Sequence, residues 1–453
     1  MSLRRFKPYA AYKDSGVEWL GEIPESWQSK RLKFVAPIRV SKLNVKPDDT
    51  LYVGLENVDS WTGRLLLDTQ PESVDSVVGT FKAGDVLFGK LRPYLAKAAS
   101  PDFDGVCTSE ILALRPNSGG SQRYVMYCLL NAAFIRWLDS LTFGTKMPRL
   151  SPEQVSSSFV TVPSEAEQRA IAAFLDRETA RIDALLAKKE RLIELLQEQR
   201  TALISRAVTK GLDPNVAMKD SGVEWLGQIP AHWEAKRVRH LMSRIEQGWS
   251  PDCENREADE DEWGVLKAGC VNRGVFVETE HKALPAALQP ITELEVHEGD
   301  LLMSRASGSR ELVGSVALVP KCRPRLLLCD KVFRLHLNPK EGHRPFLAYS
   351  MNSRIARWQI EVVLSGGSGL ANNIAQGVVK DLMVPVPPRP EQRAIAAFLD
   401  HEAARIDTLV SKVRDAIDCL KELRTALISA AVTGKIDVRG ASAEASATQG
   451  GVA

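Results

Sequence analysis

The chain has 453 residues, of which 44% are hydrophobic and 26% charged, and its formal net charge at pH 7 is +2. These proportions are those of a globular protein with two or three domains, and the small net charge excludes a strongly basic field over the whole surface. No apolar run approaches the roughly 20 residues of a membrane-spanning helix. Seven cysteines without a CxxC pair indicate a reducing compartment, so we expect a cytoplasmic protein without disulfides, a bound metal or a membrane partner.

The first 163 residues predict a mixed α/β domain, because short runs rich in Val, Leu and Ile alternate with turn residues. This domain opens with the string KDSGVEWLGEIPESW at Lys13–Trp27. A helix is expected near Gln122–Leu141. The expected strands are Thr50–Leu55, Asp85–Phe88 and Ile111–Leu114.

A long helix is expected over 164–210. Ser164 has the position of an N-cap, Glu167 follows at the capping-box spacing, and Gly211 stands where a helix ends. Apolar residues recur in steps of four and three, which is the period of a coiled coil. The expected interface positions are Ile171, Leu175, Ile182, Leu185, Leu192, Leu196 and Leu203.

A second mixed domain is predicted over 211–388 and a second long helix over 389–437, ending near Gly434. A helix is also expected near Arg344–Val363, and the Ala/Ser/Gly-rich tail at 438–453 is expected to be disordered. The expected strands are Gly264–Ala268, Asp300–Met303, Ser315–Val319 and Val332–Leu337. The expected interface positions of the second long helix are Ile395, Leu399, Ile406, Leu409, Val413, Leu420, Leu423 and Leu427.

Two internal repeats link these segments. EQRAIAAFLD occurs at Glu167–Asp176 and Glu391–Asp400, and 30 of 47 aligned positions are identical between 167–213 and 391–437. KDSGVEWLG recurs at 219–227, so one module is used twice. If the second domain is compact, the first helix ends where the second begins, and the helices run antiparallel with one domain at each end. The expected fold class is therefore α+β, with two pseudo-symmetric mixed α/β domains separated by an antiparallel two-helix coiled coil.

Each helix could instead pack only on its own domain, as most amphipathic helices do, although the repeat favours pairing. Outward-facing arginines are also repeated between the two helices. Arg169, Arg181 and Arg200 recur as Arg393, Arg405 and Arg424. A partner that binds both helices explains this match, and recent duplication without selection is the competing explanation.

Catalytic motifs are missing from the sequence. It has no GxxxxGK[ST] phosphate loop, no Asn/Asp-Pro-Pro-aromatic signature of adenine methyltransferases, and no histidines at metal-ligand spacing. We therefore predict no catalytic or metal-binding residue. Asp252, Glu280 and Lys282 imitate a nuclease site, but an acid-rich loop explains them better.

Two loops in each domain carry side chains that suit DNA. Arginine and lysine bind guanine, asparagine and glutamine bind adenine, and serine or glycine allows close approach to phosphate. In each domain the first loop follows a GDxL string; in the second domain the other loop follows the Gly/Ser run at 365–369. Single arginines in such loops are often merely solvated, so the main support is that both domains have such a pair. The candidate DNA-binding residues are Lys90, Arg92, Tyr94, Lys97, Lys146, Arg149, Arg305, Ser307, Ser309, Arg310, Asn372, Asn373 and Gln376.

The order of KDSGVEWLGxIPxxW, GDxL and EQRAIAAFLD…RTALIS resembles the specificity subunit of Type I restriction–modification enzymes, from about Lys13 to about Asp437. The resemblance implies a non-catalytic, sequence-specific DNA-binding subunit whose two target-recognition domains each recognise one half of a bipartite, asymmetric site. It implies that the helices set the spacer between the halves and dock two methyltransferase subunits, which restriction subunits join. S-adenosylmethionine, ATP and Mg would be bound by those partners, and no cofactor by this chain. The second domain lacks the KxRPYL string that follows GDVL, so inferences from that string hold only for the first domain.

Two other functions stay open at this point. A protein-binding coiled-coil scaffold without DNA recognition would show no salt-dependent affinity for duplex DNA. A nuclease would cleave DNA in a metal-dependent reaction that Asp252→Ala abolishes.

Overall fold

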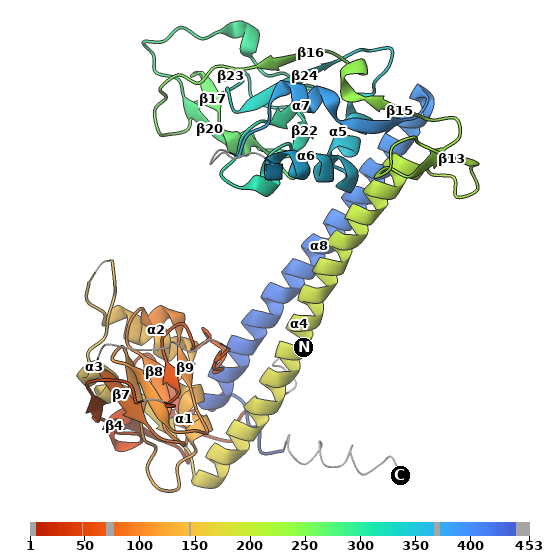
Figure 1. Cartoon of the computed structure of the whole chain (residues 1–453). Coiled ribbons are helices and arrows are strands. Elements are labelled where there is room, and N and C mark those ends of the chain that lie inside the picture. The colour runs from red at the N-terminus through yellow and green to blue at the C-terminus, as the bar shows by residue number, and fades with distance from the viewer. Residues whose placement is uncertain (1–5, 48, 69–76, 145, 367–371, 441–453) are drawn as a thin grey trace. The chain divides into compact units, whose positions relative to one another are not determined.

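The computed structural model describes residues 6–47, 49–68, 77–144, 146–366 and 372–440. It divides into two compact units. Figure 1 colours the chain by residue number, from red at the N-terminus to blue at the C-terminus. Unit 1 comprises 1–190 and 413–453, and unit 2 comprises 191–412. Each unit combines a β-rich domain with one half of each long helix, α4 (Glu165–Lys210) and α8 (Arg389–Val432). The predicted disordered tail lies outside the described residues from 441 onward.

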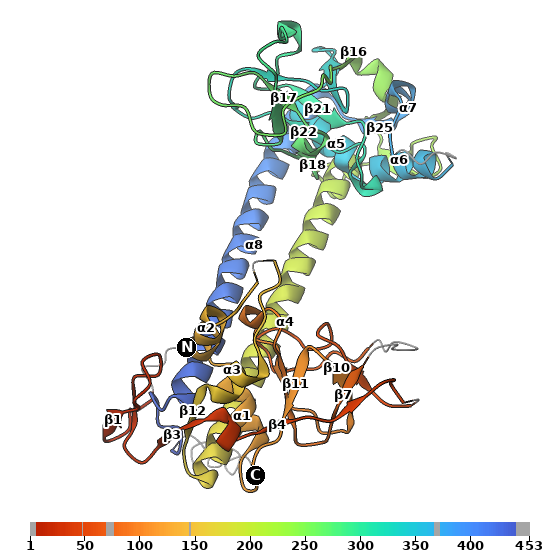
Figure 2. The ribbon, with the colours of Figure 1, turned by 90° about the vertical axis from the view of Figure 1, so that its left-hand side faces the viewer.

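The domain of unit 1 is built on two sheets, seen in Figure 2. The main sheet has the antiparallel order β4-β11-β8-β9, and the second sheet has the order β5-β7-β10-β6, in which β6 and β10 are parallel. The main-sheet strands are β4 (Ile38–Arg39), β8 (Val86–Gly89), β9 (Ala98–Ala99) and β11 (Ile111–Leu114). The second-sheet strands are β5 (Lys42–Leu43), β6 (Tyr52–Val53), β7 (Val78–Phe81) and β10 (Gly105–Thr108).

Both faces of the main sheet of unit 1 are covered, because every residue of β8 is buried. Alternate residues of a strand point to opposite faces. Val86 and Phe88 belong to the core shared with α1 (Gln122–Leu129) and the long helices, whereas Leu87 belongs to a smaller core formed with the second sheet. The loop that follows β8 is therefore held on a sheet that is packed on both faces.

Unit 2 repeats the main sheet with the same strand order, β16-β24-β21-β22. Its second sheet differs, with the order β20-β17-β23 beside a separate hairpin, β18–β19. The main-sheet strands are β16 (Met242–Gln247), β21 (Leu301–Ser304), β22 (Val316–Leu318) and β24 (Val332–Leu337). The others are β17 (Gly264–Leu266), β18 (Val271–Asn272), β19 (Val275–Phe276), β20 (His281–Ala283) and β23 (Leu326–Leu327).

Each helix expected beside a main sheet consists of two helices. In unit 1, Asn131 ends the continuity after α1 and caps α2 (Ala132–Ser140), since its side chain accepts a hydrogen bond from Ala133 N at 2.9 Å. In unit 2, Ser353 separates α5 (Arg344–Asn352) from α6 (Arg354–Gly366). Short helices follow in both units: α3 (Pro152–Ser157) and α7 (Gln376–Asp381). The prediction of single helices was wrong because it overlooked these internal caps.

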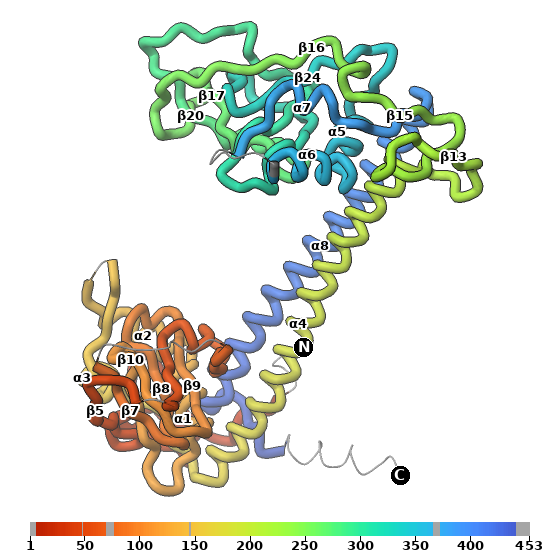
Figure 3. Tube along the Cα trace, in the orientation of Figure 1, coloured from red at the N-terminus to blue at the C-terminus, as the bar shows by residue number. Residues whose placement is uncertain are grey.

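The repeated KDSGVEWLG string forms the same hairpin in both units, and Figure 3 shows the second one beside the end of α4. In unit 1, β1 (Tyr12–Asp14) pairs with β2 (Glu22–Pro24). In unit 2, β13 (Met218–Asp220) pairs with β14 (Gln228–Pro230) in the same register. A further strand follows each hairpin and pairs with the strand that leads into the long helix. These pairs are β3 (Gln28–Arg31) with β12 (Phe159–Val162) and β15 (Glu234–Arg237) with β25 (Met383–Val386).

The predicted helix ends agree with the structure. Ser164 Oγ accepts a hydrogen bond from Glu167 N at 3.3 Å at the start of α4. Gly211 and Gly434, which follow the two long helices, have φ of +74° and +72°, and such left-handed residues at helix ends are commonly glycine. No helix in the described part of the chain is long and apolar enough to cross a membrane.

Helices α4 and α8 are paired and antiparallel. The pairing is seen separately in each unit: Asp183 of α4 contacts Arg424 of α8 at 3.1 Å in unit 1, and Arg200 contacts Asp407 at 3.7 Å in unit 2. As residue numbers rise along α4, those of the α8 partners fall. Of the expected interface positions, seven are buried: Ile171, Leu175, Ile182, Ile395, Leu399, Ile406 and Leu427. Five are half-buried: Leu196, Leu203, Val413, Leu420 and Leu423.

The remaining three positions differ from the expectation: Leu185, Leu192 and Leu409 are 40%, 42% and 41% exposed. The less exposed stripe of α4 has a step of about 3.6 residues, the period of a straight α-helix, and not the 3.5 of a sustained heptad. This stripe consists of Ile171, Leu175, Glu178, Ile182, Leu186, Lys189, Ile193, Leu196, Arg200, Leu203 and Ala207. The heptad would place Leu185 and Leu192 on this stripe, but Leu186 and Ile193 lie there instead. In α8, Val410 is buried in the place expected for Leu409.

Candidate nucleic-acid interface and its connection to the helices

In unit 1, the loop after β8 lies against the loop that leads into α3. Leu91 and Arg149 form a β-bridge, Arg92 N donates to Pro148 O at 2.7 Å, and Leu150 N donates to Lys90 O at 3.0 Å. These backbone bonds bring together two loops that lie about 50 residues apart in the sequence. The four predicted residues Lys90, Arg92, Lys146 and Arg149 therefore belong to one ribbon at the end of β8.

Of the predicted residues of this ribbon, Arg92, Tyr94 and Lys146 are exposed. Arg92 has φ of +52°, an unusual left-handed conformation for a non-glycine residue, followed by a short 3-10 turn, Pro93–Leu95. Arg149 is half-buried and pairs with Glu110 at 3.2 Å. The sequence prediction missed two apolar members of the ribbon, Phe143 (58% exposed) and Met147 (55%), because no pattern distinguishes an exposed aromatic from a core one.

Lys97 has a different role from the one predicted. Its ammonium donates to Leu55 O at 2.6 Å and to Val58 O at 2.7 Å, so it holds the segment after β6 against the main sheet. Burial lowers the pKa of Lys97, and the nearby carboxylates of Asp59 and Glu56 oppose this shift. Because its donors are used inside the domain, Lys97 is a structural residue in this conformation.

Unit 2 has a corresponding pair of loops. Ala306 and Asn373 form a β-bridge, Ser307 N donates to Asn372 O at 3.2 Å, and Ile374 N donates to Arg305 O at 2.9 Å. The two ribbons thus share one frame, a loop after the GDxL strand bonded to the segment before the next short helix. Gln376 begins α7 and is half-buried. Part of the Gly/Ser run, 367–369, lies outside the described residues.

Several predicted side chains of unit 2 are bonded within the domain. Arg305 Nη1 donates to Asp330 O at 3.1 Å, and its guanidinium lies 5.9 Å from the ring centre of Phe333. Arg310 Nη2 donates to Glu361 O at 3.1 Å, and Asn372 donates to Gly308 O at 3.3 Å. Ser307 Oγ accepts from Ser309 N at 3.2 Å. The exposed Asn373 is the predicted residue of this ribbon that best combines accessibility with a base-reading side chain.

The aspartate of each GDxL string is bonded inside its own domain, at the start of the strand that leads to the ribbon. Asp85 is fully buried, accepts from Lys82 N at 2.7 Å and forms ion pairs with Arg115 and Arg39. Asp300 accepts from His297 N at 3.0 Å and lies 3.4 Å from the guanidinium of Arg334. The repeated motif thus closes the turn before the strand that ends at the ribbon, and it makes no direct contribution to the interface.

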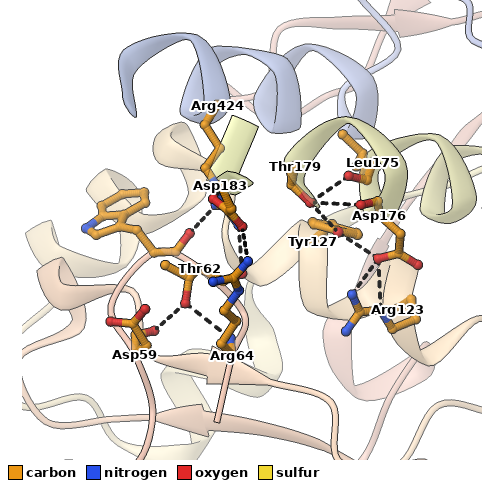
Figure 4. A network of polar contacts seen from close by, with 11 residues as sticks. Asp59, Thr62, Arg64, Arg123, Tyr127, Leu175, Asp176, Thr179, Asp183 and Arg424 are labelled. Carbon is orange, nitrogen blue, oxygen red and sulfur yellow. Dashed lines mark hydrogen bonds and ion pairs between the residues drawn. The ribbon is translucent and has the colours of Figure 1, made fainter. Parts of the chain in front are cut away.

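A polar network joins the domain of unit 1 to both long helices (Figure 4). Arg424 of α8 pairs with Asp183 of α4 at 3.1 Å and donates to Trp61 O at 2.5 Å and Thr62 O at 2.7 Å. Arg64 adds a second ion pair with Asp183 at 2.8 Å. The turn that contains Trp61 and Arg64 is therefore fixed to the helix pair. The expectation that Arg424 faces outward was wrong, because this turn of the domain binds its guanidinium and buries it.

A second contact of this kind recurs in both units. In unit 1, Tyr127 Oη donates to Asp176 at 2.7 Å, and Arg123 Nε donates to the same carboxylate at 3.0 Å. Burial raises the pKa of Tyr127 to about 12, and its contact with the Asp176 carboxylate acts in the same direction. In unit 2, Tyr349 Oη donates to Asp400 at 2.8 Å. Since Asp176 and Asp400 are the same position of the helix repeat, each domain is attached to its helix in the same way.

These features correspond to a known family. The profile of the Type I restriction modification DNA specificity domain matches residues 80–195, which include β8, the ribbon of unit 1 and the first half of α4. The EcoEI specificity subunit of Escherichia coli is 28% identical over 242 residues, 53% of this chain and 40% of that protein. The StySPI specificity subunit of Salmonella potsdam is 21% identical over 436 residues, 92% of this chain and 90% of that protein. The chain belongs to the specificity subunits of Type I restriction–modification systems.

A solved structure from a study of the assembly of a Type I restriction–modification system has the same fold. It covers 91% of this chain and 99% of its own, with a TM-score of 0.67 and 20% identity. The predicted α+β class with two paired long helices is confirmed. As a specificity subunit, the chain is the DNA-specificity component of such a system and is not itself catalytic. Of the three residues of the nuclease alternative, Glu280 forms an ion pair with Lys267 at 3.2 Å.

Proposed function

We propose that the two target-recognition domains, 1–163 and 211–388, each recognise one half of a bipartite, asymmetric DNA site through the ribbon at the end of the GDxL strand. One observation carries this proposal: both ribbons have the same backbone frame but carry different side chains. Unit 1 presents Arg92, Tyr94 and Lys146, and unit 2 presents Asn373 beside Ser307. A shared frame with different donors and acceptors suits the recognition of two different base sequences in the major groove.

We further propose that the helices, 164–210 and 389–437, set the spacer between the half-sites and dock two methyltransferase subunits, which restriction subunits join in the cytoplasm. Arg424 is buried, but Arg169 and Arg181 are exposed and recur as the exposed Arg393 and Arg405. This identity on the outer faces of the helices supports a partner that binds twice. S-adenosylmethionine, ATP and Mg would be bound by those partners. The specificity subunit determines which DNA sequence is recognised, and its partners catalyse the reactions.

The recognition proposal is tested with one variant in each ribbon, Lys146→Ala and Asn373→Ala. Sequencing of methylated adenines in cells that carry the complete system reports the recognised bases. Asn373→Ala should relax the specificity of one half-site only, because a bidentate amide contact gives about 1–3 kcal/mol of discrimination. Lys146→Ala should weaken binding to all sequences and reduce the slope of log affinity against log salt by about 1, as loss of a phosphate contact does.

Lys189→Ala, which alters a helix residue outside both ribbons, is the control and should change neither property. If Asn373→Ala alters both half-sites, general destabilisation explains it better than loss of a base contact. If the assembled complex binds duplex DNA without salt dependence, the chain acts as a protein scaffold and the recognition proposal is wrong.

The spacer proposal predicts that deleting seven residues from each long helix shortens the recognised spacer and leaves both half-sites unchanged. The deletion removes about two turns from each helix, so it preserves the face of each helix that meets the other. Methylome sequencing gives the spacer directly. Deletion of seven residues from one helix alone is the control, because it breaks the pairing and should abolish modification. An unchanged spacer in the double deletion would contradict the proposal that the helices set the spacer.

A further inference from the structure

The helix repeat places the same ion pair in two different environments. Arg424 and Asp183 of unit 1 correspond to Arg200 and Asp407 of unit 2, since each arginine and each aspartate holds the same position of the repeat. The unit 1 side chains are 7% and 10% exposed, and those of unit 2 are 34% and 65% exposed. Something that covers the pair in unit 1 is therefore lacking in unit 2.

The cover in unit 1 is a turn of the domain itself. Val58 and Leu65 form a bridge, and the six residues between them make a turn in which Trp61 and Gly63 have φ of +65° and +79°. This turn offers the carbonyls of Trp61 and Thr62 to Arg424, and its Arg64 binds Asp183. The guanidinium and the carboxylate are both satisfied by one short segment.

The corresponding hairpin of unit 2, β18–β19, is shorter. Only four residues separate Val271 from Phe276, and the turn is made by Arg273 and Gly274, with φ of +50° and +84°. The unit 1 turn follows β6 and this hairpin follows β17, each of which pairs in parallel with a later strand of its second sheet, but the hairpin lies against Asn352 at the end of α5. Among the residues described in unit 2, none of its carbonyls accepts a hydrogen bond from Arg200.

Arg200 is consequently left with unused donors. Its Nε lies 3.7 Å from Asp407, is shielded from solvent and has no hydrogen-bond partner within the described residues. A guanidinium has five N–H donors in a fixed plane, and shielded donors without a partner are unfavourable. The carboxylate of Asp407 is open to solvent beside it, so the site suits a neutral or basic group and disfavours a phosphate.

We infer that Arg200 and Asp407 form a docking point for a tight turn of a methyltransferase subunit, the partner named in the proposed function on which this inference rests. The turn of the partner offers main-chain carbonyls to Arg200 and a basic side chain to Asp407, as residues 61, 62 and 64 do within unit 1. The two methyltransferase copies therefore contact different surfaces. In unit 2 the ion pair of Arg200 and Asp407 is free to bind the partner, whereas in unit 1 the equivalent pair is already covered by residues 59–64 of the specificity subunit.

The test uses the full chain assembled with methyltransferase subunits, and native mass spectrometry and sedimentation give the stoichiometry. Wild type should bind two copies. Arg200→Ala and Asp407→Lys should each weaken the second copy by about tenfold or more, since each removes charge-assisted hydrogen bonds. Arg191→Ala, which removes an exposed arginine paired with Glu194 on the same helix as Arg200 and not repeated in α8, is the matched control and should leave both copies bound.

A third variant keeps Arg200 and Asp407 but replaces residues 272–275 with DSWTGR, the sequence of 59–64. The longer turn should cover the pair and also weaken the second copy, so the test does not depend on the stability of the single substitutions. Two copies bound with wild-type affinity in all three variants would overturn the inference and leave the proposed function intact. Loss of DNA affinity with unchanged stoichiometry would place a phosphate at Arg200 and also overturn it. A wild-type chain that binds no methyltransferase would contradict the proposed function itself.

Discussion

Arg424→Ala is expected to lower the free energy of unfolding of unit 1 by about 3–5 kcal/mol, the usual cost of removing one partner of a buried ion pair. The substitution leaves the carboxylate of Asp183 buried with only Arg64 as a cation and leaves the carbonyls of Trp61 and Thr62 without their donor. Hydrogen exchange read by mass spectrometry should show faster exchange in the 58–65 turn and in the neighbouring turns of α4 and α8.

Arg200→Ala is the natural comparison, because Arg200 holds the same place in the other half of the repeat. Its ion pair is long and partly exposed, so the expected loss is below about 1 kcal/mol. Equal losses in the two variants would show that the turn at 59–64 does not contribute to the stability of unit 1. The comparison also separates the role of this arginine in folding from the partner contact inferred for unit 2.

The sequence predicted features that depend on local patterns and on the repeat. Ser164, Gly211 and Gly434 were assigned as helix ends, because capping and left-handed positions restrict residue type. The paired loops in each domain were also predicted, since the GDxL string marks the strand from which the first loop leaves. The antiparallel pairing followed from the order of domains and helices along the chain.

Features that depend on distant contacts could not be predicted in this way. Lys97 resembles its basic neighbours in the sequence, but its ammonium is directed to two carbonyls some 40 residues earlier. The exposure of Leu185 and Leu192 reflects a small difference between 3.5 and 3.6 residues per turn, which accumulates along a helix. Arg424 is covered and Arg200 is not, because the hairpin turn of unit 2 is two residues shorter than the turn of unit 1. No sequence motif marks this difference in length.

In each unit, a tryptophan that follows the hairpin packs against the glycine at the end of a long helix. Trp233 follows the second hairpin, and a Cβ on Gly211 at the end of α4 would lie 3.3 Å from its ring. Trp27 follows the first hairpin and has the same relation to Gly434 after α8, although about 400 residues separate them in the chain. Asp437 N donates to Lys7 O at 2.8 Å, so a backbone contact in unit 1 takes the place of the covalent link in unit 2.

Trp233→Ala is expected to destabilise unit 2 by about 3–5 kcal/mol, because the side chain is fully buried and its removal leaves a large cavity. Trp358→Ala is the matched control: that side chain is 46% exposed, so its loss should be much smaller. Chemical denaturation followed by hydrogen exchange of unit 2 measures both changes. Similar losses in the two variants would mean that the hairpin is not required to hold the ends of α4 and α8.

Substitution by phenylalanine distinguishes the two buried tryptophans. Trp233 Nε1 donates to Glu391 at the start of α8 at 3.0 Å, where His232 also contacts the carboxylate at 2.8 Å. Trp27 Nε1 has no partner among the described residues, and the corresponding Glu167 accepts from Tyr9 Oη at 2.7 Å. Trp233→Phe should therefore cost about 1.5–3 kcal/mol more than Trp27→Phe, the value of a hydrogen bond to a charged group. Equal costs would show that ring packing alone anchors both hairpins. The junction of α4 with the second hairpin, which is covalent, and that of α8 with the first hairpin, which is not, would then be stabilised in the same way.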